Sequence, residues 1–286
     1  MSTTTEPTTR FATSADGTTI AFQTTGDGPA LVVVDGALCS RTMGPSQDLA
    51  AHLASRFCVT SYDRRGRGDS DAGASPHSLD REVEDLRAVL EAVGGHAHVL
   101  GVSSGGAIAL EAARIGTPID QVVVYEAPFI VDGTHPANDL RLPQRLQTMV
   151  DAGRRGEAVA TFLRTVGLPR PVVAVMRWLP MWRSLTALAH TLPYDLSIVV
   201  PFQQGRPLPE GHYEAVRVPT LVIAGGKSPR YMRNAQAAIA AAVPGARFQV
   251  LAGQTHMVKA QVVAPVVATF LAGATGAGRD RRTAPA

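Results

Sequence analysis

The sequence predicts an α/β fold in which a doubly wound, mostly parallel sheet carries a mostly helical insertion. Short apolar runs typical of buried strands alternate with helical segments over residues 10–129, and the alternation resumes over 214–272. Between them, residues 130–213 show helical patterning and many prolines, so we expect a helical lid inserted into the core. Residues 273–286, rich in glycine, arginine and alanine, are expected to form a flexible tail.

The length, composition and charge of the chain argue against several classes of protein. Its 286 residues, 45% of them hydrophobic, suffice for one large domain with an insertion. It has no long apolar run and residues 1–10 are polar, so we expect a cytoplasmic protein with no membrane partner. The net charge of +3 is scattered, and the arginines at 64–67 and 279–282 lack interleaved aromatic residues, which argues against nucleic-acid binding. Cys39 and Cys58 are too few for a disulfide scaffold.

The first half of the chain is expected to alternate strands and helices. Residues 11–14 and 18–24 predict a hairpin around Asp16-Gly17, a two-residue turn signal. Apolar residues then recur at helical spacing from 79 to 93, and acidic residues crowd the first turns of that segment, where a helix dipole favours them. The remaining elements expected in this half are a helix at 47–54 and strands at 31–34, 57–62, 99–101 and 121–125.

The second half of the core follows the insertion. Residues 220–224 and 248–251 are expected to form strands, and residues 230–242 and 257–271 helices. Parallel strands place their carboxyl ends at one edge of the sheet, and the sites of such folds form there. The functional residues are therefore expected in the loops that begin at positions 35, 63, 101, 126, 225 and 252.

The most informative local pattern is Gly101-Val102-Ser103-Ser104-Gly105, which follows an apolar run and opens an alanine-rich helix. It matches the nucleophile elbow, in which a serine lies on a strained turn between a strand and a helix. The residues two before and two after that serine must be small so that the backbones can approach, and both are glycine here. Ser103 is therefore the candidate nucleophile. The neighbouring Ser104 lacks this pair of glycines, and a plain glycine–serine turn is the other interpretation.

A serine hydroxyl becomes a useful nucleophile only when a base takes its proton. Among the eight histidines, His256 follows the last expected strand, so it lies in a loop at the carboxyl edge of the sheet. It also comes last in the chain order serine, acid, histidine that elbow-type hydrolases show. His256 is therefore the candidate general base, and a histidine of the core or surface is the alternative.

Four motifs in this order make the chain resemble the α/β-hydrolase family over about residues 11–272. They are Asp35-Gly36-Ala37 and the segments at 63–70, 101–106 and 253–256. The resemblance implies an α/β-hydrolase fold with a lid and a serine nucleophile. It also implies that the backbone N–H groups of Ala37 and Ser104 form the oxyanion hole.

The chain departs from the pattern of that family in two places. Asp35 stands where members usually have histidine, which puts a carboxylate near the oxyanion hole. The family usually places its catalytic Asp after the strand that here ends at 224, but this chain has Ser228 there. Because no Asp or Glu occurs between Glu214 and Asp280, the acid must come from elsewhere or be absent.

Glu126 is the candidate acid. It follows the strand expected at 121–125, and some members of the family carry their acid after that strand. An unpaired carboxylate at the end of a buried strand is unfavourable, and pairing with His256 would remove that penalty. An ion pair with an arginine is the alternative, and Asp132 is the second candidate for the acid.

The candidate substrate-binding residues lie in the insertion. Trp178, Met181 and Trp182 lie in an apolar stretch of it. They are expected either to bind the apolar part of a substrate or to pack the lid on the core.

These features predict a serine hydrolase that cleaves a carboxylic ester, lactone or thioester of a small-to-medium apolar substrate through an acyl-enzyme. We expect catalysis by Ser103, His256 and Glu126, with a small molecule as the partner and with no cofactor and no metal. One alternative is a non-hydrolytic enzyme of this fold, a lyase or cyclase that uses serine and histidine for proton transfer. Another is a degenerate member that only binds a ligand, which the missing Asp favours and the intact elbow opposes.

Overall fold

An extended sheet is the centre of the fold in the computed structural model, which describes residues 8–74 and 76–279. Within these residues the sheet has eight strands in the order β1-β2-β4-β3-β5-β6-β7-β8. Neighbouring strands from β4 to β8 are parallel, whereas β2 runs antiparallel to both β1 and β4. The predicted fold class is confirmed. The strands are β1 (Arg10–Thr13), β2 (Thr19–Thr25), β3 (Ala30–Val34), β4 (Cys58–Tyr62), β5 (Ala97–Val102), β6 (Ile119–Tyr125), β7 (Thr220–Gly225) and β8 (Arg247–Leu251).

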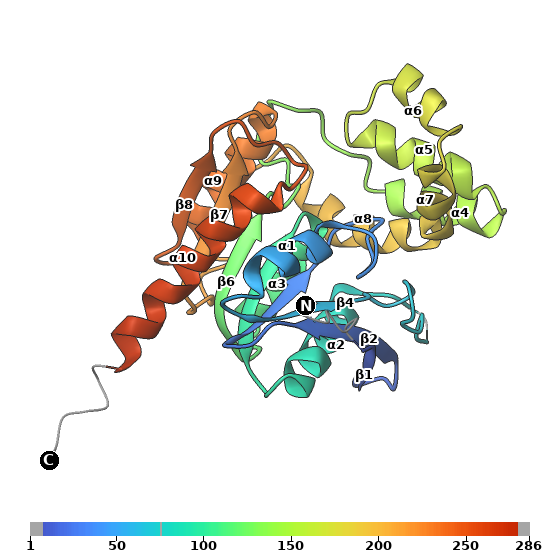
Figure 1. The fold of residues 1–286 in the computed structure, drawn as a ribbon. Coiled ribbons are helices and arrows are strands. Elements are labelled where there is room, and N and C mark those ends of the chain that lie inside the picture. Colours follow the sequence, from blue (N-terminus) through green and yellow to red (C-terminus); the bar gives the residue numbers. More distant parts are fainter. Residues whose placement is uncertain (1–7, 75, 280–286) are drawn as a thin grey trace, which may run out of the picture.

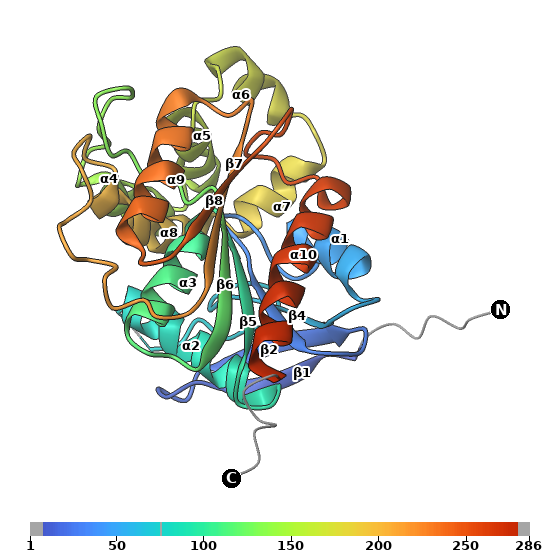
Figure 2. The same cartoon turned by 90° about the vertical axis from the view of Figure 1, so that its left-hand side faces the viewer.

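Helices cover both faces of the sheet (Figure 2). In β3, Leu31 and Val33 belong to one buried apolar cluster, and Val32 and Val34 belong to the other. This placement explains why the strand reads as a continuous apolar run. The first cluster packs under α1 (Pro45–Leu53) and α10 (Ala260–Arg279), and the second under α2 (Leu79–Ala92), α3 (Ser104–Arg114) and α9 (Arg230–Ala242).

Residues 130–213, here called the helical insertion, contain no strand in the described chain. Figure 1 shows α4 to α7 set to one side of the sheet, while α8 reaches the core and packs against α3. Leu192 and Leu196 of α8 are buried in the same apolar cluster as α3. The helices are α4 (Leu142–Asp151), α5 (Arg155–Thr165), α6 (Arg170–Met176), α7 (Met181–Ala187) and α8 (Leu192–Val199).

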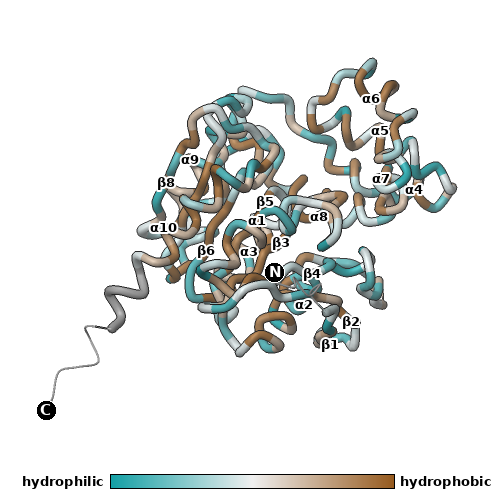
Figure 3. Tube along the Cα trace, viewed as in Figure 1, coloured by the Kyte–Doolittle hydropathy of each residue, from teal (hydrophilic) through white to brown (hydrophobic). Residues whose placement is uncertain are grey.

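The hydropathy of the chain follows this architecture. In Figure 3 the central strands are hydrophobic, and apolar stretches also occur in the helical insertion. In the described part of the chain, no helix is long and apolar enough to cross a membrane.

The end of the chain differs from its prediction. The last helix begins at Ala260 rather than 257, and it continues to Arg279 rather than ending at 271. Gly273 follows the predicted end and is a residue type that often ends helices, but no proline follows Pro265 until 285, so the helical hydrogen bonds can continue past it. Part of the tail expected at 273–286 is therefore helical, and residues 280–286 lie outside the described chain.

Candidate active site

Ser103 lies between the end of β5 and the start of α3. Its backbone has φ 56° and ψ −125°, a left-handed conformation that side-chain-bearing residues rarely adopt. The Ser103 N–H donates a hydrogen bond of 2.9 Å to the carbonyl of Tyr125, which ties the turn to β6. Such strain persists only where the surroundings enforce it, and it is common at functional residues.

The glycines beside Ser103 are required by close backbone contacts. A Cβ on Gly101 would lie 2.5 Å from the carbonyl oxygen of Gly105. A Cβ on Gly105 would lie 2.0 Å from the carbonyl oxygen of Val34 in β3. Any larger residue would separate α3 from the sheet and would turn Ser103 away from its present position.

Gly36 brings the end of β3 against the same serine. A Cβ on Gly36 would lie 2.8 Å from Cβ and 3.3 Å from Oγ of Ser103. The peptide that joins Gly36 to Ala37 is therefore next to the Ser103 hydroxyl. The structure thus gathers Ala37, Ser103 and Ser104, which come from two different strand ends.

His256 meets Glu126 at the same edge of the sheet. Nδ1 of His256 lies 3.1 Å from Oε2 of Glu126, and the other carboxylate oxygen accepts a 2.6 Å hydrogen bond from the backbone N–H of Gly225. The Glu126 side chain is fully buried, whereas the His256 side chain is 40% exposed. With Nδ1 held by the carboxylate, Nε2 is the ring nitrogen left to exchange a proton.

The backbone around Glu126 is held from several sides. Glu126 has φ 50°, again in the left-handed region. Its N–H donates to the carbonyl of Ile223 at 3.2 Å, and the side chain of Gln236 bonds both the N–H and the carbonyl of Ala127. The Tyr125 hydroxyl donates to the carbonyl of Thr255 at 2.6 Å, next to His256. These bonds hold Glu126 and the loop of His256 in a fixed relation.

The loop after β7, where the family pattern places an Asp, supports Glu126 instead. Ser228 is buried, and its Oγ lies 2.7 Å from the position that a Cβ on Gly225 would occupy. The backbone N–H of Gly225 donates to Glu126. Asp132, the second candidate acid, bonds Thr134 and Asn234. The ion pair that the structure gives His256 is therefore with Glu126.

Asp35 is directed toward the start of α1. A Cβ on Gly44 would lie 3.1 Å from its Oδ2, and the carboxylate is 3% exposed. Neither carboxylate oxygen has a hydrogen bond of normal geometry among the described residues. Burial raises the pKa of Asp35 to about 6, although Ser46, Arg67 and Arg64 act in the opposite direction.

The three residues expected to contact a substrate differ in their surroundings. Trp178 is 90% exposed and Met181 is 49% exposed. Trp182 is half-buried against the apolar core of the insertion, with the Arg177 guanidinium 5.7 Å from its ring centre. Trp182 therefore packs the insertion, while Trp178 and Met181 present apolar surface.

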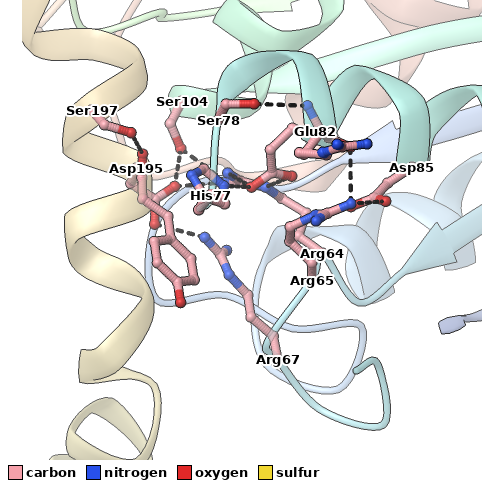
Figure 4. A network of polar contacts seen from close by, with 12 residues as sticks. Arg64, Arg65, Arg67, His77, Ser78, Glu82, Asp85, Ser104, Asp195 and Ser197 are labelled. Carbon is pink, nitrogen blue, oxygen red and sulfur yellow. Dashed lines mark hydrogen bonds and ion pairs between the residues drawn. The ribbon is translucent and has the colours of Figure 1, made fainter. Parts of the chain in front are cut away.

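A buried polar network beside Ser104 was not predicted from the sequence. It consists of Arg64, Arg67, Ser104 and Asp195, and Figure 4 shows it with Glu82 and His77. The sequence carries one signal of it, because Asp195 is the only acidic residue between Glu157 and Glu210 and lies in an apolar stretch.

Residues 36–266 match the family described as the alpha/beta hydrolase family. The chain is similar to an alpha/beta hydrolase from Sphaerobacter thermophilus, with 41% identity, a TM-score of 0.83 and coverage of 92% of this chain and 100% of that one. An uncharacterized protein of Mycobacterium tuberculosis is 28% identical over 268 residues, which cover 87% of this chain and 76% of the relative. An esterase from Thermogutta terrifontis shares the fold alone, at 19% identity and a TM-score of 0.66, with coverage of 93% and 98%.

Proposed function

Because this chain belongs to the α/β-hydrolase family, we propose that it is a serine hydrolase that cleaves a carboxylic ester, lactone or thioester with a small-to-medium apolar part. The observation that carries the proposal is the pair of His256 and Glu126, 3.1 Å apart, at the edge of the sheet where the strained Ser103 lies. A base held by a buried acid, at the same edge of the sheet as a serine on an elbow, is the arrangement that acyl transfer needs.

In the proposed reaction, Ser103 Oγ attacks the carbonyl carbon and passes its proton to Nε2 of His256. Glu126 orients the imidazole and stabilises the positive charge that it gains. The backbone N–H groups of Ala37 and Ser104 receive the negative oxygen of the tetrahedral intermediate. The histidine then returns its proton to the leaving alcohol or thiol, and a water molecule clears the acyl group by the same steps.

The helical insertion is proposed to act as the lid of this site. Trp178 and Met181 contact the apolar part of the substrate, because their exposed side chains offer surface that water leaves readily. Trp182 supports them through its packing within the insertion.

Labelling with a fluorophosphonate tests the nucleophile without knowledge of the substrate. Intact mass is measured for the wild type, Ser103→Ala and His256→Ala, with Ser104→Ala as the matched control on the neighbouring hydroxyl. Once labelling is complete, whatever its rate, we expect one adduct on the wild type and on Ser104→Ala, and none on the other two variants. A folded wild type that gains no mass contradicts the proposal, and so does an adduct that survives in Ser103→Ala.

The reaction class is then tested with 4-nitrophenyl butyrate, γ-butyrolactone and butyryl thiocholine. Hydrolysis of at least one by the wild type, lost in Ser103→Ala, is expected. Labelling of Ser103 without hydrolysis in a wider series of esters, lactones and thioesters would instead favour the lyase or cyclase alternative.

A further inference from the structure

The network of Arg64, Arg67, Ser104 and Asp195 is buried beside the site, and the mechanism proposed above does not use these side chains. Each of the four side chains is at most 2% exposed. The two arginines come from the loop after β4, Ser104 from α3 and Asp195 from α8 of the helical insertion. Figure 4 shows them side by side, although the residues are up to 131 positions apart.

Arg67 controls the orientation of one peptide at the site. Its Nη1 donates a 2.6 Å hydrogen bond to the carbonyl oxygen of Gly36. That carbonyl belongs to the same planar peptide as the N–H of Ala37, and in a trans peptide the two point in opposite directions. Fixing the Gly36 oxygen therefore fixes the direction of the Ala37 N–H. A charged donor on the oxygen also polarises the peptide and strengthens its N–H as a donor.

Asp195 holds Arg67 in that place. Its Oδ2 accepts a 2.6 Å bond from Nη2 of Arg67. Its Oδ1 accepts 2.7 Å bonds from the hydroxyl of Ser104 and from Nη1 of Arg64. Although burial opposes ionisation, Arg67 and Arg64 hold the pKa of Asp195 below its usual range, so the carboxylate is charged at neutral pH.

We propose that Asp195 is a positioning residue for the oxyanion hole, acting on the Ala37 N–H through Arg67 and the Gly36 carbonyl, and on Ser104 through its hydroxyl. The inference rests on the proposed function, because it assigns the two N–H donors of that mechanism. Asp195 touches neither donor directly. It keeps both of them in place from a helix of the insertion.

The chain contains a matched pair for comparison. Arg65 and Asp85 form an ion pair with bonds of 2.6 and 2.7 Å, and Arg65 comes from the same loop as Arg67. The other hydrogen bonds of Arg65 in the described chain go to Asp16 and to the carbonyl of Arg81. Breaking this pair disturbs a buried arginine of the same loop without removing a bond to the end of β3.

The test compares Asp195→Asn with Asp85→Asn in the full-length protein. Steady-state kinetics with 4-nitrophenyl butyrate separate kcat from KM, and thermal unfolding gives the loss of stability of each variant. Inhibition by phenylboronic acid, which forms a tetrahedral adduct on an active-site serine, measures the oxyanion hole. Inhibition by butyrate, which lacks the tetrahedral centre, measures ground-state binding.

Both variants are expected to lower Tm, because each removes a negative counter-charge from a buried guanidinium. Only Asp195→Asn is expected to lower kcat, by about 10- to 100-fold, since removing one oxyanion donor outright costs about 10²- to 10³-fold. Its KM and its inhibition by butyrate should stay within about threefold, and its inhibition constant for phenylboronic acid should rise by the same factor as kcat falls.

A second variant separates positioning from stability. Arg67→Met combined with Asp195→Leu removes the two charges of that ion pair, and Arg64 keeps its ion pair with Glu82, so much of the stability should return. The Gly36 carbonyl still lacks its donor, so kcat should stay low. This double variant also carries the test if Asp195→Asn does not fold.

The outcomes distinguish the two proposals. A wild type that neither gains a fluorophosphonate adduct nor hydrolyses an ester overturns the proposed function, and this inference with it. An active wild type whose kcat is unchanged in Asp195→Asn overturns the inference alone. Equal losses of kcat in Asp195→Asn and Asp85→Asn overturn it as well, because the effect would then be general destabilisation.

Discussion

Glu126 at the end of β6 and Asp195 in α8 are both buried carboxylates at the edge of the sheet that holds Ser103, yet their partners differ. Glu126 shares its charge between the imidazole of His256 and the backbone N–H of Gly225. Asp195, by contrast, receives two guanidinium groups and a hydroxyl.

This difference separates a carboxylate that can respond to chemistry from one that cannot. The salt-bridge partner that the structure gives Glu126 is a histidine, which is positively charged only when it is protonated. When His256 is protonated, its positive charge therefore faces a Glu126 carboxylate that is not paired with an arginine or lysine among the described residues. The negative charge of Asp195 is always balanced by its arginine partners, since arginine keeps its proton. The first carboxylate suits a reaction, and the second suits a fixed geometry.

The largest loss of activity is expected from Glu126→Gln. The amide keeps the shape of the side chain but removes the charge that orients and stabilises the imidazolium, so kcat should fall by about 10²- to 10⁴-fold. Single-turnover kinetics with 4-nitrophenyl butyrate measure the change. Asp132→Asn is the control, and its rate should match the wild type. The reverse pattern would mean that the acid has been misassigned.

A smaller effect is expected at Asp35, a third buried carboxylate, for which the described residues provide no ion pair. Its pKa lies near 6 in the fold against 3.8 for an ordinary aspartate. The folded protein therefore binds more protons than the unfolded chain between about pH 4 and pH 6, and Asp35 lowers the free energy of unfolding as pH rises through that window. Arg64 and Arg67, together with Ser46, are the groups that oppose this change.

Replacing Asp35 by Asn removes this dependence on pH. The free energy of unfolding of Asp35→Asn, relative to the wild type, should rise from pH 4 to pH 7.5 by about 2–2.5 kcal/mol. Urea unfolding at the two pH values measures the difference. A relative stability that does not change with pH would show that Asp35 is compensated by a partner, as Asp195 is.

The smallest effect on stability is expected in the part of the insertion that carries neither carboxylate. Trp178→Ala should change the free energy of unfolding by less than about 0.5 kcal/mol, because the side chain is 90% exposed. Trp182→Ala should cost about 1–2 kcal/mol through lost packing. If the insertion contacts substrate through its exposed residues, Trp178→Ala raises KM for an apolar ester about fivefold and leaves kcat unchanged. A changed kcat would contradict the idea that, within the insertion, only α8 affects the chemical step.

The fold was predictable because buried parallel strands leave an unmistakable pattern. Residues 31–34 contribute to apolar clusters on both faces of the sheet, and the sequence there is continuously apolar. The end of α10 was missed because glycine often ends a helix, whereas Gly273, just after the predicted end, lies within the helix. The strained turn at Ser103 was predictable from its glycines, since backbone contacts closer than 3 Å admit no side chain.

The site was predictable only where its parts are local motifs or where an expected residue is missing. Glu126 was inferred from the absence of acids after Glu214, and the structure places its carboxylate against His256. No motif or missing residue in the sequence predicts the role proposed for Asp195. Its partners Arg64 and Arg67 are 131 and 128 positions away, and only the packing of α8 on α3 brings them together.

The bond between Asp195 and Arg67 also limits how this scaffold can be recombined. One way to seek a new substrate range would be to replace the helical insertion with that of a relative. Here a graft that replaced residues 130–213 without an acid at the position of Asp195 would strand the Arg67 charge inside the protein. The core and α8 therefore form one unit, and a graft that ends before α8 should fold more successfully than one that includes it.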